Sequence, residues 1–378
     1  MAKPRTNFLQ RPSDNPYLTL STNFGLPYTC QDLCTRIFEA PSLKHLLKPG
    51  YDGFLIKSLG RPGSPSDPYL PSLLWELSRH EDICTIFLEQ VNWSFFNPSR
   101  HVWHASITAF RNVTYLGLIE VSLLGEELCS LIRSFPLQGL ELHKCSITNA
   151  LPLQPLAIDP ETIMLNQQGP EIENLIITVG EDSSLLEFFT QLWSPLSFRE
   201  LGGLSISGKG GRDSAQEIVR LVEISDPFDL SINCDNLYLG NAPPILTLCD
   251  VRKLSIFIPF DGAKDFQRTS DCLWWWIASL KEVPQDNDFA EISIKFFVNR
   301  YSITYLPTGR SMIPWIHFDE ALSDWKFKLY GRFSAISLRA DEMDMPPFDP
   351  QLYDEWIRSY ALVRSFTSHL GNSFRRRA

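Results

Sequence analysis

The sequence predicts an α/β fold, a leucine-rich-repeat-like solenoid (a horseshoe) of parallel strands with helical crossovers. A short aliphatic-x-aliphatic unit recurs from residue 86 to residue 338, and amphipathic helical patterns lie between several of its copies. One unit buries only a few aliphatic side chains, each contributing roughly 1.5–3 kcal/mol, which is too little to offset its ordering entropy. Stacked units bury both faces, so the array is expected to fold where one unit would not.

The copies of this unit are the predicted strands. Alternation places each aliphatic pair on one side of its strand, and neighbouring strands must be parallel because each returns through a crossover. Copies with a central serine are Leu204–Ile206, Leu230–Ile232, Leu254–Ile256, Ile292–Ile294 and Ile336–Leu338, and earlier copies with another central residue are Ile86–Leu88, Leu116–Leu118, Leu140–Leu142 and Leu175–Ile177.

One copy fits the leucine-rich-repeat template closely. Leu137, Leu140, Leu142, Cys145 and Ile147 follow L-x-x-L-x-L-x-x-C-x-I, with cysteine in the position that the template gives to Asn or Cys. The neighbouring copy has the same spacing with valine in that position. The flanking residues therefore extend the signal beyond the aliphatic pair.

The crossovers are expected to be helical because their apolar residues recur at i, i+3, i+4 and i+7. The predicted helices cover residues 125–135, 182–193, 213–223 and 271–283. A doubly wound α/β enzyme would also alternate strands and helices, and it remains the alternative. That alternative predicts a glycine-rich phosphate loop after the first strand, and the sequence has none there.

The chain is expected to have three parts. Residues 1–70 are a Pro-rich N-terminal segment with one short helix at Thr29–Glu39 and an irregular cap that includes a strand at Tyr51–Leu59. Residues 71–345 form the repeat array. Residues 346–378 contain a capping helix at Pro350–Phe366 and a basic tail, and this helix would cover the last repeat.

Composition narrows the function classes. The formal net charge is −10, whereas nucleic-acid binding needs a basic face, so we expect no nucleic-acid partner. The start lacks an apolar signal segment and no run of about 18 apolar residues occurs, which predicts no membrane association. Eight cysteines without a C-x-x-C pair are expected to stay reduced, and a cytoplasmic or nuclear location is predicted.

The sequence contains no recognisable catalytic motif. We therefore expect the chain not to be an enzyme and to carry no cofactor and no metal. Gly208–Arg212 lacks the phosphate-loop spacing and is read as a flexible turn. His101 and His104 are separated by three positions but have no third ligand at matching spacing. An α/β enzyme with an unrecognised site remains an alternative, as does a repeat scaffold unrelated to ubiquitin.

From Phe110 to Ile147 the chain resembles the F-box/leucine-rich-repeat-like proteins that are abundant in mushroom-forming fungi. The resemblance spans roughly residues 40–366. It implies that a Skp-type adaptor of a cullin ubiquitin ligase binds F-box helices while the repeats recruit a target. The chain departs from this family at the F-box opening L-P-x-E-L, because Leu26–Pro27 is followed by Tyr28-Thr29-Cys30, and Ile37–Phe38 lies too far along the chain.

The predicted protein-binding face consists of the residues between and beside the paired aliphatics. They are Phe87, Glu89, Tyr115, Ile119, Glu141, His143, Ile176, Thr178, Phe257, Lys295 and Arg339. The first eight are larger or more charged than the serines of the C-terminal copies, so the contact is placed there. Charge reversal at Glu89 and Glu141 is expected to weaken partner binding without lowering the melting temperature.

Overall fold

The structure is a computed structural model. It divides into two compact units, residues Met1–Ile206 and Ser207–Ala378. The residues that it describes are 18–21, 53–57, 70–79, 83–91, 100–148, 169–180, 184–191, 194–198, 201–208, 214–233, 244–260, 266–283, 291–298, 317–318, 320–321 and 337–339.

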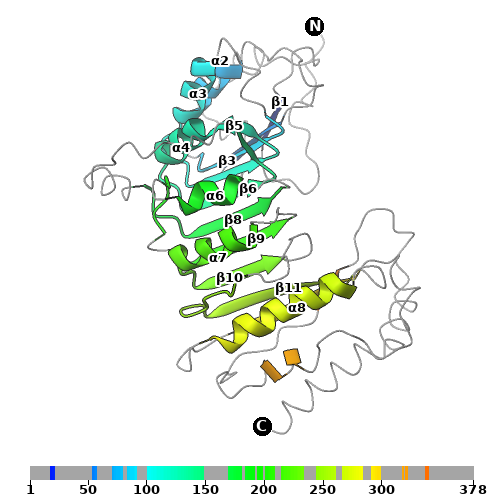
Figure 1. Cartoon of the computed structure of the whole chain (residues 1–378). Helices are drawn as coiled ribbons and strands as arrows, with labels where there is room; N and C mark the ends of the chain where they lie inside the picture. Colours follow the sequence, from blue (N-terminus) through cyan, green and yellow to red (C-terminus); the bar gives the residue numbers. More distant parts are fainter. Residues whose placement is uncertain are drawn as a thin grey trace, which may run out of the picture. The chain divides into compact units, whose positions relative to one another are not determined.

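The first unit contains a parallel sheet whose strands follow the order of the sequence (Figure 1). Its strands are β1 (Leu18–Ser21), β2 (Gly53–Lys57), β3 (Thr85–Glu89), β4 (Tyr115–Ile119), β6 (Gly139–His143), β8 (Asn174–Val179) and β9 (Gly203–Gly208). All the predicted strands of this part of the chain are found, and β2 lies within the strand predicted at Tyr51–Leu59. Equivalent residues of neighbouring repeats are aligned across the sheet, so that Leu116 of β4 lies opposite Leu140 of β6.

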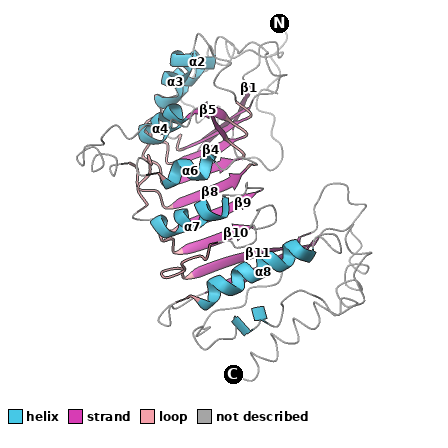
Figure 2. Cartoon of the chain, viewed as in Figure 1, coloured by secondary structure: helices cyan, strands magenta, loops and turns pink. Residues whose placement is uncertain are grey.

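Helices connect these strands along one side of the sheet (Figure 2). They are α2 (Leu70–Leu77), α3 (Arg100–Thr108), α4 (Gly125–Ser134) and α6 (Ser184–Thr190). The helices predicted at 125–135 and 182–193 are confirmed by α4 and α6, whereas α2 and α3 were not expected. The Glu127 carboxylate accepts a hydrogen bond from the Leu124 backbone N–H at 2.8 Å, which satisfies one N-terminal amide of α4.

The second unit repeats this design. Its elements are α7 (Ser214–Ser225), β10 (Asp229–Asn233), β11 (Lys253–Phe260), α8 (Phe266–Lys281), β12 (Glu291–Val298) and β13 (Ser337–Arg339). Strands β10 to β13 are again parallel and in sequence order. Helices α7 and α8 confirm the helices predicted at 213–223 and 271–283.

The serine column of the second unit is partly confirmed. Ser231, Ser255 and Ser293 lie opposite one another on β10, β11 and β12. Ser337 does not continue the column, because it pairs with Lys295, two residues beyond Ser293. A parallel strand can shift by two residues and keep every side chain on its original face, so the aliphatic pattern alone does not fix this register.

The aliphatic pairs form the core, as predicted from alternation. Leu116, Leu118, Leu140 and Leu142 are fully buried, and the residues between them on the same strands are less buried or glycine. The helix faces that close this core are also apolar, as with Leu128 of α4. Burial of this kind supplies the dominant stabilising term of the fold.

A repeated turn follows three of the strands. Gln90, Glu120 and Lys144 come directly after β3, β4 and β6 and have φ values of 56°, 53° and 49°. This left-handed conformation is uncommon for residues with a Cβ atom. It directs Val121 and Cys145 into the interior and starts two further short strands, β5 (Ser122–Leu124) and β7 (Ser146–Thr148), which pair in parallel.

The architecture is therefore α/β with a mostly parallel sheet. Within each unit the strand order does not reverse, which differs from the doubly wound alternative. The helices predicted at Thr29–Glu39 and Pro350–Phe366, like the basic tail, lie outside the described residues. Within the described ranges, no helix combines the length and apolar character that crossing a membrane requires.

Candidate functional site

The open strand face of the first unit carries the side chains that point away from the core. Eight predicted residues lie on it, and all are half-buried: Phe87, Glu89, Tyr115, Ile119, Glu141, His143, Ile176 and Thr178. They come from β3, β4, β6 and β8, which are consecutive in the sheet. The structure thus brings together residues that are up to 91 positions apart, from Phe87 to Thr178.

Cross-strand pairing arranges these side chains in rows. In one row Phe87, Gly117, Glu141 and Ile176 lie opposite one another. The next row contains Glu89, Ile119, His143 and Thr178. Glu141 therefore has Ile176 as its direct neighbour on β8, and His143 has Ile119 and Thr178 on either side.

Two glycines make room for two aromatic rings on this face. A Cβ atom on Gly117 would lie 2.1 Å from the Phe87 ring, and one on Gly139 would lie 2.5 Å from the Tyr115 ring. Both rings therefore lean over the neighbouring strand. Their centroids are 5.8 Å apart at an interplanar angle of 43°, within the range of favourable aromatic pairs.

A polar network crosses three strands beside these rings. The Tyr115 hydroxyl donates to Oε2 of Glu141 at 2.5 Å, and His143 Nε2 bonds to Oε1 of the same carboxylate. His143 Nδ1 lies 2.6 Å from Oγ1 of Thr178. Because a carboxylate only accepts, Nε2 must carry a proton, and the Thr178 hydroxyl donates to Nδ1 whenever the imidazole is neutral.

The network keeps Glu141 ionised. The hydrogen bond from His143 is the main cause of a lowered pKa at Glu141, and the bond from Tyr115 acts in the same direction. Partial burial raises the pKa and opposes them. The side chain of Glu141 is 20% exposed, so a negative charge is held at a largely covered position of the face.

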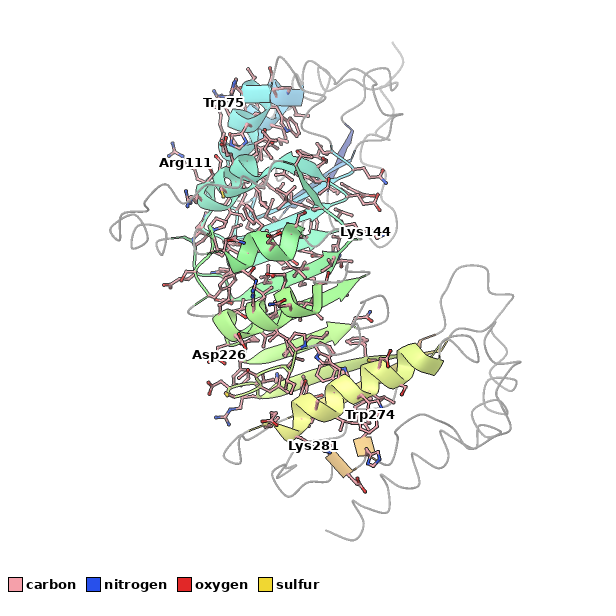
Figure 3. All side chains as sticks on the ribbon, viewed as in Figure 1. Trp75, Arg111, Lys144, Asp226, Trp274 and Lys281 are labelled. Atoms are coloured by element: carbon pink, nitrogen blue, oxygen red, sulfur yellow. The ribbon has the colours of Figure 1, made fainter. Side chains whose placement is uncertain are left out.

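A second polar ladder borders the face and was missed by sequence reasoning. Gln90 Nε2 donates to Oε2 of Glu120 at 2.9 Å, and Lys144 Nζ lies 3.8 Å from Oε1 of Glu120. All three residues have positive φ in the turns that follow β3, β4 and β6, so the ladder depends on a turn geometry that no sequence motif marked. Lys144 and Arg111 lie at opposite ends of the strands of this unit (Figure 3).

The polar network of the open strand face offers proton transfer as its chemistry. A histidine between a carboxylate and a hydroxyl can hold or pass a proton. Within the described part of the chain, no group of three or more His, Cys, Asp or Glu side chains could hold a metal ion. His101 and His104 lie on α3, and His104 bonds through Nε2 to the Ser130 hydroxyl at 2.8 Å.

The three remaining predicted residues belong to the second unit. Phe257 is half-buried on β11 and pairs with Lys295 on β12. Arg339 pairs with Phe297, two residues beyond Lys295, because of the shifted register of β13. The side chains of Lys295 and Arg339 lie outside the described residues.

Charged residues begin three strands of the second unit, β10, β11 and β12, in register. Asp229 lies opposite Lys253, which lies opposite Glu291. Burial is the main cause of a raised pKa at Asp229; Glu291 adds to the rise and Lys253 opposes it. Alternating charges at this strand end favour the observed register.

An apolar groove between α2 and α3 was also not predicted. Its volume is about 630 Å³, and its lining includes Trp75, Glu76, His101 and Val102. Trp75 is 50% and Val102 59% exposed. Neither helix was expected, so sequence reasoning had no means of pairing these residues.

The chain was compared with protein-family models, with curated proteins and with solved structures, and none of these comparisons gave a match.

Proposed function

We propose that this chain is a leucine-rich-repeat-like solenoid and a non-catalytic scaffold that binds a partner protein through the open strand face of its first unit. The solenoid interpretation is supported by strands that follow in sequence order within each unit, with helices as crossovers. Such arrays commonly use an extended strand surface for recognition.

The observation that carries the binding proposal is the composition of the face. The ionised carboxylate of Glu141 shares this face with four half-buried aromatic and aliphatic residues, Phe87, Tyr115, Ile119 and Ile176. Protein interfaces favour aromatic residues at their centre and polar residues at the rim. Here the rim is the ladder of Gln90, Glu120 and Lys144.

The resemblance to F-box/leucine-rich-repeat-like proteins suggests a role as the target-recognition part of a ubiquitin-ligase adaptor in the cytoplasm or nucleus. A Skp-type protein is then one expected partner. Copurification with a Skp-type protein would support this role, and a different stable partner would favour a scaffold unrelated to ubiquitin.

The binding proposal is tested by photo-crosslinking in native cells. A benzophenone amino acid replaces Ile119 on the face or, as a matched control, Glu187, which is exposed on α6. We expect one discrete crosslinked protein from position 119, identified by mass spectrometry, and none from position 187. Crosslinking from position 187 alone, or from neither position while a partner still copurifies, would overturn the proposed face.

A further inference from the structure

The centre of the open strand face is an unusual anion. Glu141 accepts from Tyr115 through Oε2 and from His143 through Oε1. A carboxylate offers about four lone-pair positions, so these two described bonds leave acceptor capacity on both oxygens. With a neutral imidazole, the group of Tyr115, Glu141, His143 and Thr178 carries one negative charge.

The surroundings of this anion are apolar on several sides. Ile176 lies directly opposite Glu141 on β8, and Ile119 lies beside His143 on β4. The Tyr115 ring contributes its hydroxyl to the carboxylate and its apolar faces to the surface. A partner that covers this area removes the remaining water from the carboxylate, and a buried charge is costly unless further charge or hydrogen bonds compensate for the lost water. A covering group that supplies positive charge or hydrogen-bond donors is therefore favoured.

The other charged positions along this row have mixed sign. Glu89 is half-buried on the row of His143, two strands away, and Lys57 lies opposite it on β2. The rim cation Lys144 is exposed and lies beside the acidic Glu120. The net charge of −10 adds long-range attraction for a basic partner.

We propose, building on the proposed function, that Glu141 is the anchor for a lysine or arginine side chain of the partner, so that the recognised segment is basic. The cation bonds to the open lone pairs of Glu141. Its aliphatic stem packs on Ile119 and Ile176, and the neighbouring Tyr115 ring adds cation–π attraction.

The test uses the full chain with isoleucine methyl groups labelled for NMR. Three capped pentapeptides that alternate glycine with arginine, lysine or glutamate serve as probes. We expect the arginine and lysine peptides to shift the methyl signals of Ile119 and Ile176, while the glutamate peptide leaves them unchanged. The Kd for the cationic peptides should rise at least about fivefold in Glu141→Gln and stay unchanged in the control Glu187→Gln.

A second variant covers the case in which Glu141→Gln loses its fold. Ile176→Lys keeps the carboxylate but places an ammonium group next to it on β8, so it should compete with the peptides and abolish their shifts. Equal binding by wild type and both variants, binding of the glutamate peptide instead, or the absence of any shift would overturn the cation anchor. Crosslinking from position 119 in cells would still support the face, so failure of this inference is distinguishable from failure of the proposed function.

Discussion

The Tyr115 ring lies where Gly139, on the neighbouring strand, would carry a side chain: a Cβ atom there would be 2.5 Å from the ring. The same ring position delivers the Tyr115 hydroxyl to Glu141. Gly139 thus holds the aromatic and polar parts of the open strand face in one arrangement, and its substitution offers a direct structural test.

We predict that Gly139→Ala lowers the free energy of unfolding by about 1–3 kcal/mol, because the added methyl group forces the ring off Glu141. Urea denaturation measures the change. The matched double mutant is Tyr115→Ala with Gly139→Ala, in which the alanine at 139 should cost much less because the ring is gone. Additive effects of the two substitutions would contradict the contact.

Acid should remove the contribution of Glu141 to the free energy of unfolding. Its pKa is lowered from an ordinary value of 4.5, so the native state holds this proton less readily than the unfolded chain. The contribution is therefore complete above about pH 5 and is lost as pH falls through the native pKa. The difference in unfolding free energy between wild type and Glu141→Gln should be about 1.5–3 kcal/mol at pH 7 and shrink toward pH 3. A difference independent of pH would refute the network as drawn.

This prediction corrects an expectation from the sequence. Charge reversal at Glu141 was expected to leave the melting temperature unchanged, which is appropriate for an exposed carboxylate. The bonds to Tyr115 and His143 make Glu141 a structural residue as well, so Glu141→Lys should lower the melting temperature. Charge reversal at Glu89 tests the face at a second position, on β3, and the melting temperature has to be measured with it.

The turn after β6 should tolerate glycine but not a β-branched residue. Lys144 has φ = 49° and its ion pair with Glu120 is largely exposed, so the pair contributes little. Lys144→Gly should change the unfolding free energy by no more than about 0.5 kcal/mol. Glycine adopts the positive φ without strain, and this gain offsets the larger conformational entropy that glycine gives to the unfolded chain. Lys144→Val should cost about 1–2 kcal/mol. Equal stability of the two variants in urea would argue against the left-handed turn.

The thiol of Cys145 should be inert in the native chain. Burial raises its pKa to about 11, and it donates to the Leu118 carbonyl at 3.2 Å. Alkylation requires the thiolate, so iodoacetamide at pH 8 should label the exposed Cys249 far faster than Cys145. In urea the two cysteines should react at similar rates. Rapid native labelling of Cys145, followed by mass spectrometry of its peptide, would contradict the buried position.

Strand positions were predictable because a period of two with one buried face is visible in the residues themselves. The helices α4, α6, α7 and α8 were predictable in the same way, because their apolar residues recur with the period of a helix. Helix α2 was missed although Leu70, Leu73, Leu74 and Leu77 stand at i, i+3, i+4 and i+7, and Pro71 in its first turn is compatible with a helix start. The pattern of α3 is less regular, because His101 and His104 lie among its apolar residues, and tertiary packing has more influence on its conformation.

The face was predicted residue by residue, but its internal bonds were not. Alternation shows that Tyr115 and Glu141 share one side of the sheet, whereas their contact depends on how the ring leans over Gly139. Gly117 was read only as a variant middle residue, although it provides the space for Phe87. Such cross-strand leaning is set by neighbouring side-chain volumes, which a single strand pattern does not contain.

The most direct test of the account is the Kd of the crosslinked partner, once purified, for Glu89→Lys against the control Glu187→Lys. Both variants change the net charge equally, but only Glu89 lies on the open strand face. We predict at least about a tenfold rise in Kd for Glu89→Lys, with the melting temperature of each variant measured alongside, and no change for Glu187→Lys. Equal affinity of the two variants would contradict the proposal that this face binds the partner.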